Sequence, residues 1–277
     1  MDKFIYNNGI KIHFQEFPGD GPVLVLLPGL TANCRVFEGL LAAGLGHACH
    51  VVSMDLRGRG GSDKPASRYS LAEHAEDVRH LIARFRGREI IPVGHSFGGL
   101  VAVWLCAHDP VLCERLILLD LAIETTDLKV VELLKPSLNR LDKTFASEKV
   151  YLDTMQQAPY LFGCWDEHLE AYFRADVRQI SKGGVKPRSS RENISACIDA
   201  VLDEDWPGLF RSLNTSTLLV NAVSDYSAAG PLVPADQAQR TVKAIDDCTY
   251  KAVHGNHVTM LFGKNAFHTA QAITTWL

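Results

Sequence analysis

The chain has 277 residues, of which 47% are hydrophobic and 22% are charged. This composition excludes intrinsic disorder and disulfide-stabilised miniproteins, and it predicts a globular chain that buries a large core. The formal charge is -4, from 28 Lys and Arg against 32 Asp and Glu, so a positively charged surface for nucleic acid is not expected.

The seven cysteines are odd in number and contain no C-x-x-C pair, which favours a reducing compartment over a disulfide framework or a zinc site. The opening MDKFIYNNG lacks the basic start and apolar stretch of a signal peptide, and no run approaches 18 apolar residues. We therefore expect a cytoplasmic protein. We expect a small-molecule substrate, with neither nucleic acid nor a membrane as partner, and we allow for a homodimer.

Alternating polarity over residues 10–15 predicts an antiparallel strand near a sheet edge. Continuously apolar runs follow, each typical of a parallel strand buried on both faces, at residues 23–27, 51–54, 90–93, 116–119 and 218–220. Residues 71–85 have the apolar spacing of a helix. This alternation predicts a doubly wound, mostly parallel α/β sheet, with its site at the carboxyl ends of the strands.

The alternation breaks after Asp120, and the next convincing strand starts near Thr217. We expect residues 1–121 and 216–277 to form the α/β core. Residues 122–215 are richer in charged and aromatic side chains and are predicted to form an inserted helical cap.

The strongest chemical signal is Gly94-His95-Ser96-Phe97-Gly98, which follows the apolar run IIPV and precedes the helix-compatible GLVAVWLCA. In such a strand–turn–helix, the serine holds a strained backbone conformation, and glycines two residues to either side relieve the crowding. Ser96 is therefore the candidate nucleophile.

A serine hydroxyl needs a base, and the base needs a carboxylate that fixes its tautomer. Among eleven histidines, His257 is the candidate base, because it lies in a Gly-Asn-His loop between a predicted last strand and the C-terminal helix. Asp225 follows the strand TLLVNA and gives the expected chain order Ser96, Asp225, His257, so it is the preferred acid. Asp120, which ends the strand LILLD, is the alternative.

An oxyanion requires N–H donors, and we expect them from the backbones of Leu30 and Phe97. The glycine-rich residues 55–63 lack the spacing of a phosphate-binding loop and are interpreted as a structural loop.

Taken together, the sequence resembles the α/β-hydrolase fold superfamily. The motifs are LLPG at 26–29, DLRGRGGSDKP at 55–65, GHSFGG at 94–99, SD at 224–225 and GNH at 255–257. A narrower similarity relates the chain to carboxylesterases and to the (acetamidomethylene)succinate hydrolases. In those succinate hydrolases the acid of the triad comes from the strand ahead of the cap, which keeps Asp120 open here.

The expected function is that of a serine hydrolase that cleaves a small carboxylic ester, or an amide or lactone, through an acyl-enzyme, with no cofactor and no metal. The alternatives are a cofactor-free 2,4-dioxygenase-like enzyme, which would share the LLPG motif, and a hydrolase-fold ligand receptor. The succinate-hydrolase resemblance implies that a basic side chain pairs with a substrate carboxylate, from Arg35, Lys186, Arg188 or Arg191.

Overall fold

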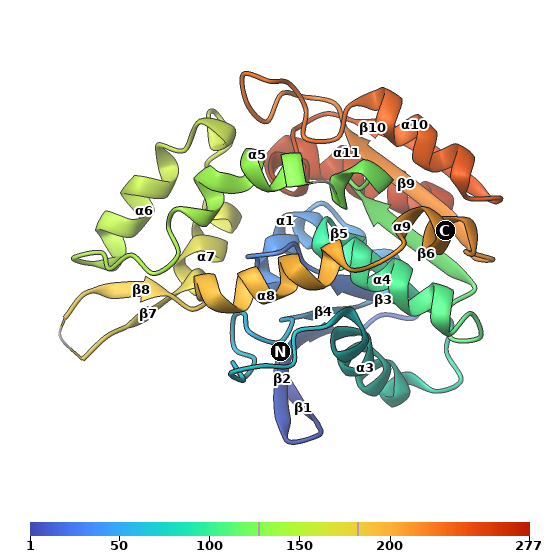
Figure 1. The fold of residues 1–277 in the computed structure, drawn as a ribbon, viewed down its shortest axis with the longest axis horizontal. Helices are drawn as coiled ribbons and strands as arrows, with labels where there is room; N and C mark the ends of the chain where they lie inside the picture. Colours follow the sequence, from blue (N-terminus) through green and yellow to red (C-terminus); the bar gives the residue numbers. More distant parts are fainter. Residues whose placement is uncertain (127, 182) are drawn as a thin grey trace.

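The fold was analysed in a computed structural model, which describes residues 1–126, 128–181 and 183–277 (Figure 1). In the described part of the chain, eight strands form one sheet in the order β1-β2-β4-β3-β5-β6-β9-β10. Their bounds are β1 Asp2–Asn7, β2 Ile10–Phe17, β3 Val23–Leu27, β4 His50–Met54, β5 Ile90–His95, β6 Arg115–Leu119, β9 Ser216–Ala222 and β10 Cys248–Val253. Strand β2 is antiparallel to β1 and β4, and the pairings from β4 to β10 are parallel.

The predicted parallel strands are confirmed, and β3 and β4 are buried along their whole length. Apolar side chains on both faces of such strands require a layer of helices on each side of the sheet. The predicted antiparallel strand is β2, one position in from the edge, and β1 forms the edge itself.

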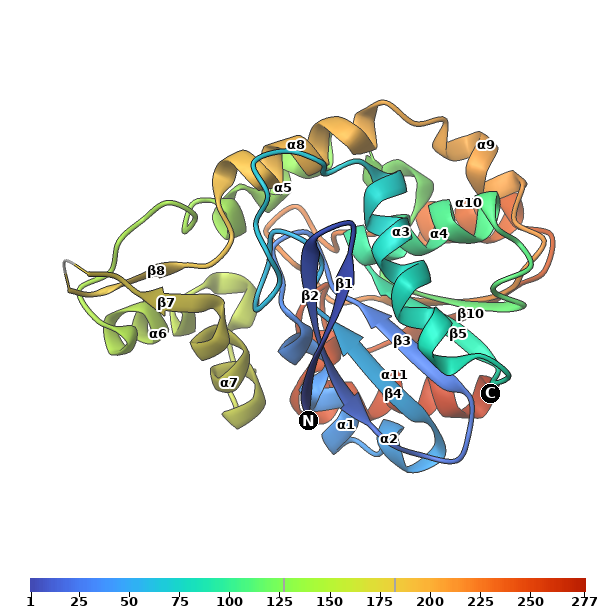
Figure 2. The same ribbon diagram turned by 90° about the horizontal axis from the view of Figure 1, so that it is seen from below.

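Helices cover both faces of the sheet (Figure 2). One core cluster includes apolar residues of α3 (Leu71–Ile82) and α4 (Phe97–His108), and the other includes those of α1 (Glu38–Ala42), α2 (Leu45–Ala48) and α11 (Gly263–Trp276). Helix α10 (Ala235–Ala244) packs beside β9 and β10. Within the described ranges, no helix is both long and apolar enough to cross a bilayer.

The chain between β6 and β9 leaves the sheet, and we call residues 122–215 the insert. Its elements are η3 Ile123–Thr126, α5 Leu128–Leu138, α6 Glu148–Gln156, η4 Pro159–Leu161, α7 Glu167–Asp176, β7 Val177–Gln179, β8 Val185–Pro187, α8 Arg191–Leu202 and α9 Trp206–Arg211. The helical content was expected, but the short antiparallel pair β7–β8 was not.

A glycine pair allows this unexpected strand pair. Gly183 and Gly184 both have left-handed backbone conformations, with φ of 84° and 86°. A Cβ atom on Gly184 would collide with the carbonyl oxygen of Phe145. Phe145 and Val185 exchange two backbone hydrogen bonds, of 2.8 and 2.9 Å, which hold β8 against the chain that follows α5.

Candidate active site

Ser96 lies in the sharp turn between β5 and α4, with φ of 53° and ψ of -122°. A side chain is strained in this conformation, so the surrounding chain must hold it. A Cβ atom on Gly94 would collide with the backbone of Gly99, and one on Gly98 would collide with the carbonyl oxygen of Leu27. The glycines that the sequence placed around Ser96 are therefore required by the close approach of neighbouring backbone.

His257 and Asp120 form a buried pair, with 2.7 Å between His257 Nδ1 and Asp120 Oδ2. The other carboxylate oxygen of Asp120 accepts hydrogen bonds from Asn221 Nδ2 at 3.0 Å and from the backbone N–H of Ala222 at 2.9 Å. Both donors belong to β9, which neighbours β6 in the sheet. These bonds fix the carboxylate of Asp120, which in turn orients the imidazole of His257. Asp120 contacts Nδ1 of this ring, so the other ring nitrogen, Nε2, is not engaged by the carboxylate.

The preference for Asp225 as the partner of His257 is therefore wrong, and the alternative, Asp120, occupies that position. Asp225 is exposed, and its backbone carbonyl accepts a 3.3 Å hydrogen bond from Asn256 Nδ2. The next residue, Tyr226, is buried and lines the cavity beside His257. The turn after β9 thus directs Tyr226 inward and leaves the Asp225 side chain in a separate polar groove.

His95, the residue before Ser96, supports the loop that carries His257. Its Nε2 donates to the backbone carbonyl of His257 at 2.7 Å, and the two imidazole rings lie 4.5 Å apart between centroids. Burial, together with the nearby His257, holds the pKa of His95 well below its ordinary value. His95 is therefore neutral at physiological pH, and its Nδ1 is buried with no hydrogen-bond partner among the described residues.

The loop after β3 is anchored by two buried arginines. Arg59 Nε donates to the carbonyl oxygen of Leu30 at 2.9 Å, and Arg140 Nη2 donates to the carbonyl oxygen of Thr31 at 3.3 Å. Arg59 comes from the glycine-rich loop at 55–65 and Arg140 from the insert, so the core and the insert both position this loop. The predicted donor Leu30 lies in this loop, while Phe97 opens α4, where the first N–H groups have no partner inside the helix.

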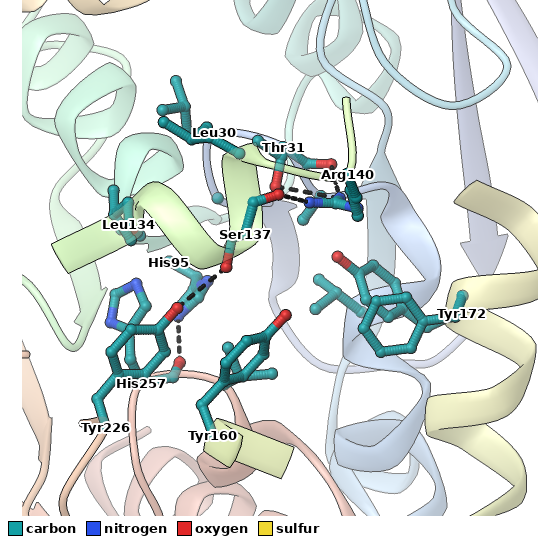
Figure 3. A pocket seen from close by; sticks show the side chains of 17 residues that line it. Leu30, Thr31, His95, Leu134, Ser137, Arg140, Tyr160, Tyr172, Tyr226 and His257 are labelled. Carbon is teal, nitrogen blue, oxygen red and sulfur yellow. Dashed lines mark hydrogen bonds between the residues drawn. The ribbon is translucent and has the colours of Figure 1, made fainter. Parts of the chain in front are cut away.

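Two cavities meet at Ser96 and His257. Ser96, His257, Leu30 and Leu134 line both of them. We call one the hydroxyl-lined cavity, which also contacts Ser137, Arg140, Tyr160, Tyr172 and Tyr226 (Figure 3). The other is the aliphatic cavity, which also contacts Leu100, Leu121, Ile198, Val201 and Leu232.

Arg140 is a cavity residue that the sequence analysis missed. Its Nε donates to Asp176 Oδ2 at 2.9 Å, and the hydroxyl of Tyr151 donates to the same oxygen. Burial opposes the charge of Arg140, but the carboxylate of Asp176 outweighs it, and the pKa of Arg140 lies well above its ordinary value. A single arginine in the stretch LNRLDK, which begins with the last residue of α5, gave no signal of this role.

The four basic residues that the resemblance implied for substrate binding do not line either cavity among the described residues. Arg35 pairs with Glu38 at 2.6 Å, and Arg191 lies 3.6 Å from Asp142. Arg188 donates to a backbone carbonyl in α7, and Lys186 lies in β8. The structure therefore gives these four residues no place in the walls of the two cavities at Ser96.

One group of described residues brings three potential metal ligands together, namely His13, Cys34 and Asp55. The carboxylate of Asp55 already accepts from His13 Nδ1, from the N–H of Cys34 and from the N–H of Gly61, each at 2.7 Å. These bonds account for the group as a structural support of the loop at 55–65, away from the cavities at Ser96.

Comparisons with known proteins identify the family and the fold. The family model of the alpha/beta hydrolase fold matches residues 22–263. A 2-(acetamidomethylene)succinate hydrolase from Mesorhizobium japonicum is 34% identical over 116 residues, which cover 41% of each chain. A protein from Mycobacterium tuberculosis is 36% identical over 113 residues, 41% of this chain and 33% of that protein. These matches thus span only about a third to two fifths of the relatives' own length.

The same fold occurs in a solved structure. The crystal structure of an E-2-(acetamidomethylene)succinate hydrolase superposes with a TM-score of 0.84, covering 99% of this chain and 98% of that one. The identity in that comparison is 22%, so the likeness shows the fold.

Proposed function

Because this chain belongs to the α/β-hydrolase family, we propose that it is a serine hydrolase that cleaves a small carboxylic ester, or an amide or lactone, through an acyl-enzyme on Ser96. The observation that carries the proposal is the buried His257–Asp120 pair at 2.7 Å, together with the two cavities that His257 and Ser96 both line. A relative named as a succinate hydrolase supports hydrolysis as the reaction class.

In the proposed first half-reaction, Ser96 Oγ attacks the carbonyl carbon and its proton moves to His257 Nε2. Asp120 stabilises the imidazolium that forms. When the tetrahedral intermediate collapses, the bond to the leaving oxygen breaks, and that oxygen takes the proton from His257 and departs as an alcohol.

In the second half-reaction, water attacks the acyl-enzyme and gives a proton to His257. The bond between the acyl group and Ser96 Oγ then breaks, and this oxygen recovers the proton, so the products are a carboxylic acid and an alcohol. The N–H groups of Leu30 and Phe97 are the proposed donors to the oxyanion in both steps. The bonds from Arg59 and Arg140 to the loop at Leu30 and Thr31 would hold that loop in place.

The test is covalent labelling of Ser96 by a fluorophosphonate, together with a burst of nitrophenolate from p-nitrophenyl acetate. Ser96→Ala should lose the label and lower kcat by at least about a thousandfold, because it removes the nucleophile while leaving the oxyanion donors. Ser67→Ala is the matched control, since Ser67 is exposed on the loop before α3. A Ser96→Ala enzyme within tenfold of the unmodified chain would contradict the proposal, and a chain without label or turnover would be a binding protein.

A further inference from the structure

The two cavities at Ser96 differ in what they offer a substrate. Both contact Ser96 and His257, so each is accessible to the reacting atoms. One presents phenol and alcohol groups, and the other presents aliphatic side chains. An acyl-transfer substrate has two arms, the acyl group and the leaving group, so the chemistry of each cavity can select one arm.

The aliphatic cavity has few free polar groups. Its described lining includes two threonines, but Thr125 Oγ1 already donates to Ala122 O and Thr126 Oγ1 donates to Ile123 O. The remaining contacts come largely from branched aliphatic side chains, among them Ile198 of α8. Such a lining favours a hydrocarbon chain.

Its size limits the length of that chain. The cavity leaves about 50 Å³ for the centres of water-sized groups. Because the centre of every such group must lie within this space, the cavity holds only a few of them at once. A methylene is of similar size, so a short acyl chain fills it.

The hydroxyl-lined cavity offers hydroxyl groups in a mostly apolar wall, and it carries no uncompensated charge among its described residues. Tyr226 Oη and Ser137 Oγ share a hydrogen bond of 3.0 Å, and Tyr160 stacks on Tyr226 with 5.2 Å between ring centroids (Figure 3). Burial raises the pKa of Tyr226 to about 12, so this phenol is neutral at physiological pH. The guanidinium of Arg140 is neutralised by Asp176.

We propose that the substrate is an uncharged ester with a short aliphatic acyl chain, that the aliphatic cavity binds this chain, and that the hydroxyl-lined cavity receives the leaving alcohol and then the hydrolytic water. The assignment rests on the proposed function. The acyl chain stays bonded to Ser96 after the alcohol leaves, and the aliphatic cavity is the one that offers this chain apolar contacts throughout the reaction. The hydrolytic water must reach the acyl carbon beside His257. In the hydroxyl-lined cavity, hydroxyl groups can hydrogen-bond to this water.

The charge of the substrate follows from the same cavity. A carboxylate that enters it must lose its hydration, and the cationic side chain there already has a buried anionic partner. An uncharged alcohol group loses less hydration free energy on entering, because the hydroxyls of Ser137 and Tyr226 can replace its water contacts. The neutral ester is therefore the better substrate.

The first experiment measures kcat/KM for methyl esters of straight-chain acids from acetate to decanoate, by proton release. We expect a maximum between butanoate and hexanoate. Ile198→Trp should fill the aliphatic cavity and lower the ratio of hexanoate to acetate hydrolysis by at least about tenfold, since a pocket discriminates by about tenfold or more per methylene. Ile198→Ala should move the maximum to longer acids.

Ser137→Ala is the matched control in the hydroxyl-lined cavity, and it should leave the acyl-chain preference unchanged. With butanoate as the fixed acid, this variant should alter the preference among methyl, ethyl and 2-hydroxyethyl esters, while Ile198→Trp should not. A reversal, in which Ile198→Trp changes the alcohol preference and Ser137→Ala changes the acid preference, would overturn the assignment of the cavities.

A second comparison sets methyl butanoate against the monomethyl ester of succinate. We expect the neutral ester to be favoured by at least about tenfold; equal hydrolysis, or faster hydrolysis of the anion, would overturn the proposal. Fluorophosphonate labelling distinguishes failure of the cavity assignment from failure of the proposed function. Labelled Ser96 with no chain-length preference would overturn only the cavity assignment, and absence of labelling would overturn the proposed function with it.

Discussion

At the scale of single residues, the acid of the site shows where a sequence argument reaches its limit. Chain order favoured Asp225, but Asp120 also lies between Ser96 and His257, so order could not distinguish the two. The difference lies in the order of the strands in the sheet. Strand β6 lies beside β5 in the sheet and β9 lies beyond β6, which places the residue after β6 next to the serine turn. Asp120 then gains two donors from β9, whereas Asp225 follows a turn that exposes it.

We therefore expect Asp120→Asn to be the severe change of the two. Loss of the carboxylate leaves His257 in the wrong tautomer and its positive charge uncompensated, which costs about ten-thousandfold in kcat by analogy with serine proteases. The measurement is kcat at neutral pH for a p-nitrophenyl ester. Asp225→Asn is the matched control, because its exposed side chain contacts neither cavity at Ser96, and it should stay within about threefold. The reverse ranking would return the acid to Asp225.

At the scale of elements, the sequence predicts what depends on short-range pattern. The glycines around Ser96 indicate the serine turn. Each parallel strand can be predicted from its own apolar run, without knowledge of the neighbouring strands. Strand β1 was missed because only Ile5 and Asn7 are buried in it, so residues 2–7 have no alternating apolar face. Strands β7 and β8 have three residues each, which is too short for a period to show.

The serine turn also makes a prediction about stability. A methyl group on Gly98 would collide with the carbonyl oxygen of Leu27, and a backbone atom cannot yield as a flexible side chain does. We expect Gly98→Ala to displace the turn, to destabilise the protein by about 1–3 kcal/mol as overpacking does, and to lower kcat by more than tenfold.

Gly46→Ala is the matched control for this change. A Cβ atom on Gly46 lies 3.5 Å from Leu41 Cδ2, which is ordinary contact, and the residue is in helix α2. Because alanine is a better helix former than glycine, the free energy of unfolding of the Gly46→Ala protein should stay equal or rise by up to about 1 kcal/mol. Urea denaturation measures both variants. Equal stability and activity of the Gly98→Ala and Gly46→Ala proteins would show that the turn has more room than the structure gives it.

At the scale of the whole molecule, the insert builds the site together with the core. Helices α5 and α8 supply Leu134 and Ile198 to the cavities, and Arg140 ties the chain after α5 to the loop at Thr31. These contacts join segments more than a hundred residues apart. No local pattern encodes them, which is why the serine turn was predicted from sequence but the cavity residues of the insert were not.

The packing of the whole chain also sets how its stability depends on pH. Burial, and then the positive charges of Arg59 and Arg57, hold the pKa of His74 well below its ordinary value, and burial does the same for His95. The unfolded chain therefore binds protons at these positions below about pH 6.5, while the folded chain does not. The free energy of unfolding must fall as the pH decreases through this range.

His13 has the opposite shift, since Asp55 outweighs the effect of burial and raises its pKa. Its contribution to stability is fully present below the unfolded pKa, so it adds no slope below pH 6.5. We expect the free energy of unfolding to drop by about 2 kcal/mol between pH 6.5 and 5.5, or about 1 kcal/mol for each of the two buried histidines, because the unfolded imidazoles go from half to almost full protonation over this range. Urea denaturation at pH 6.5, 6.0 and 5.5 measures the slope. His74→Gln should halve it, and His80→Gln should not, because that imidazole is 44% exposed. An unchanged slope in the His74→Gln protein would mean that His74 takes up its proton in the folded chain as readily as in the unfolded one.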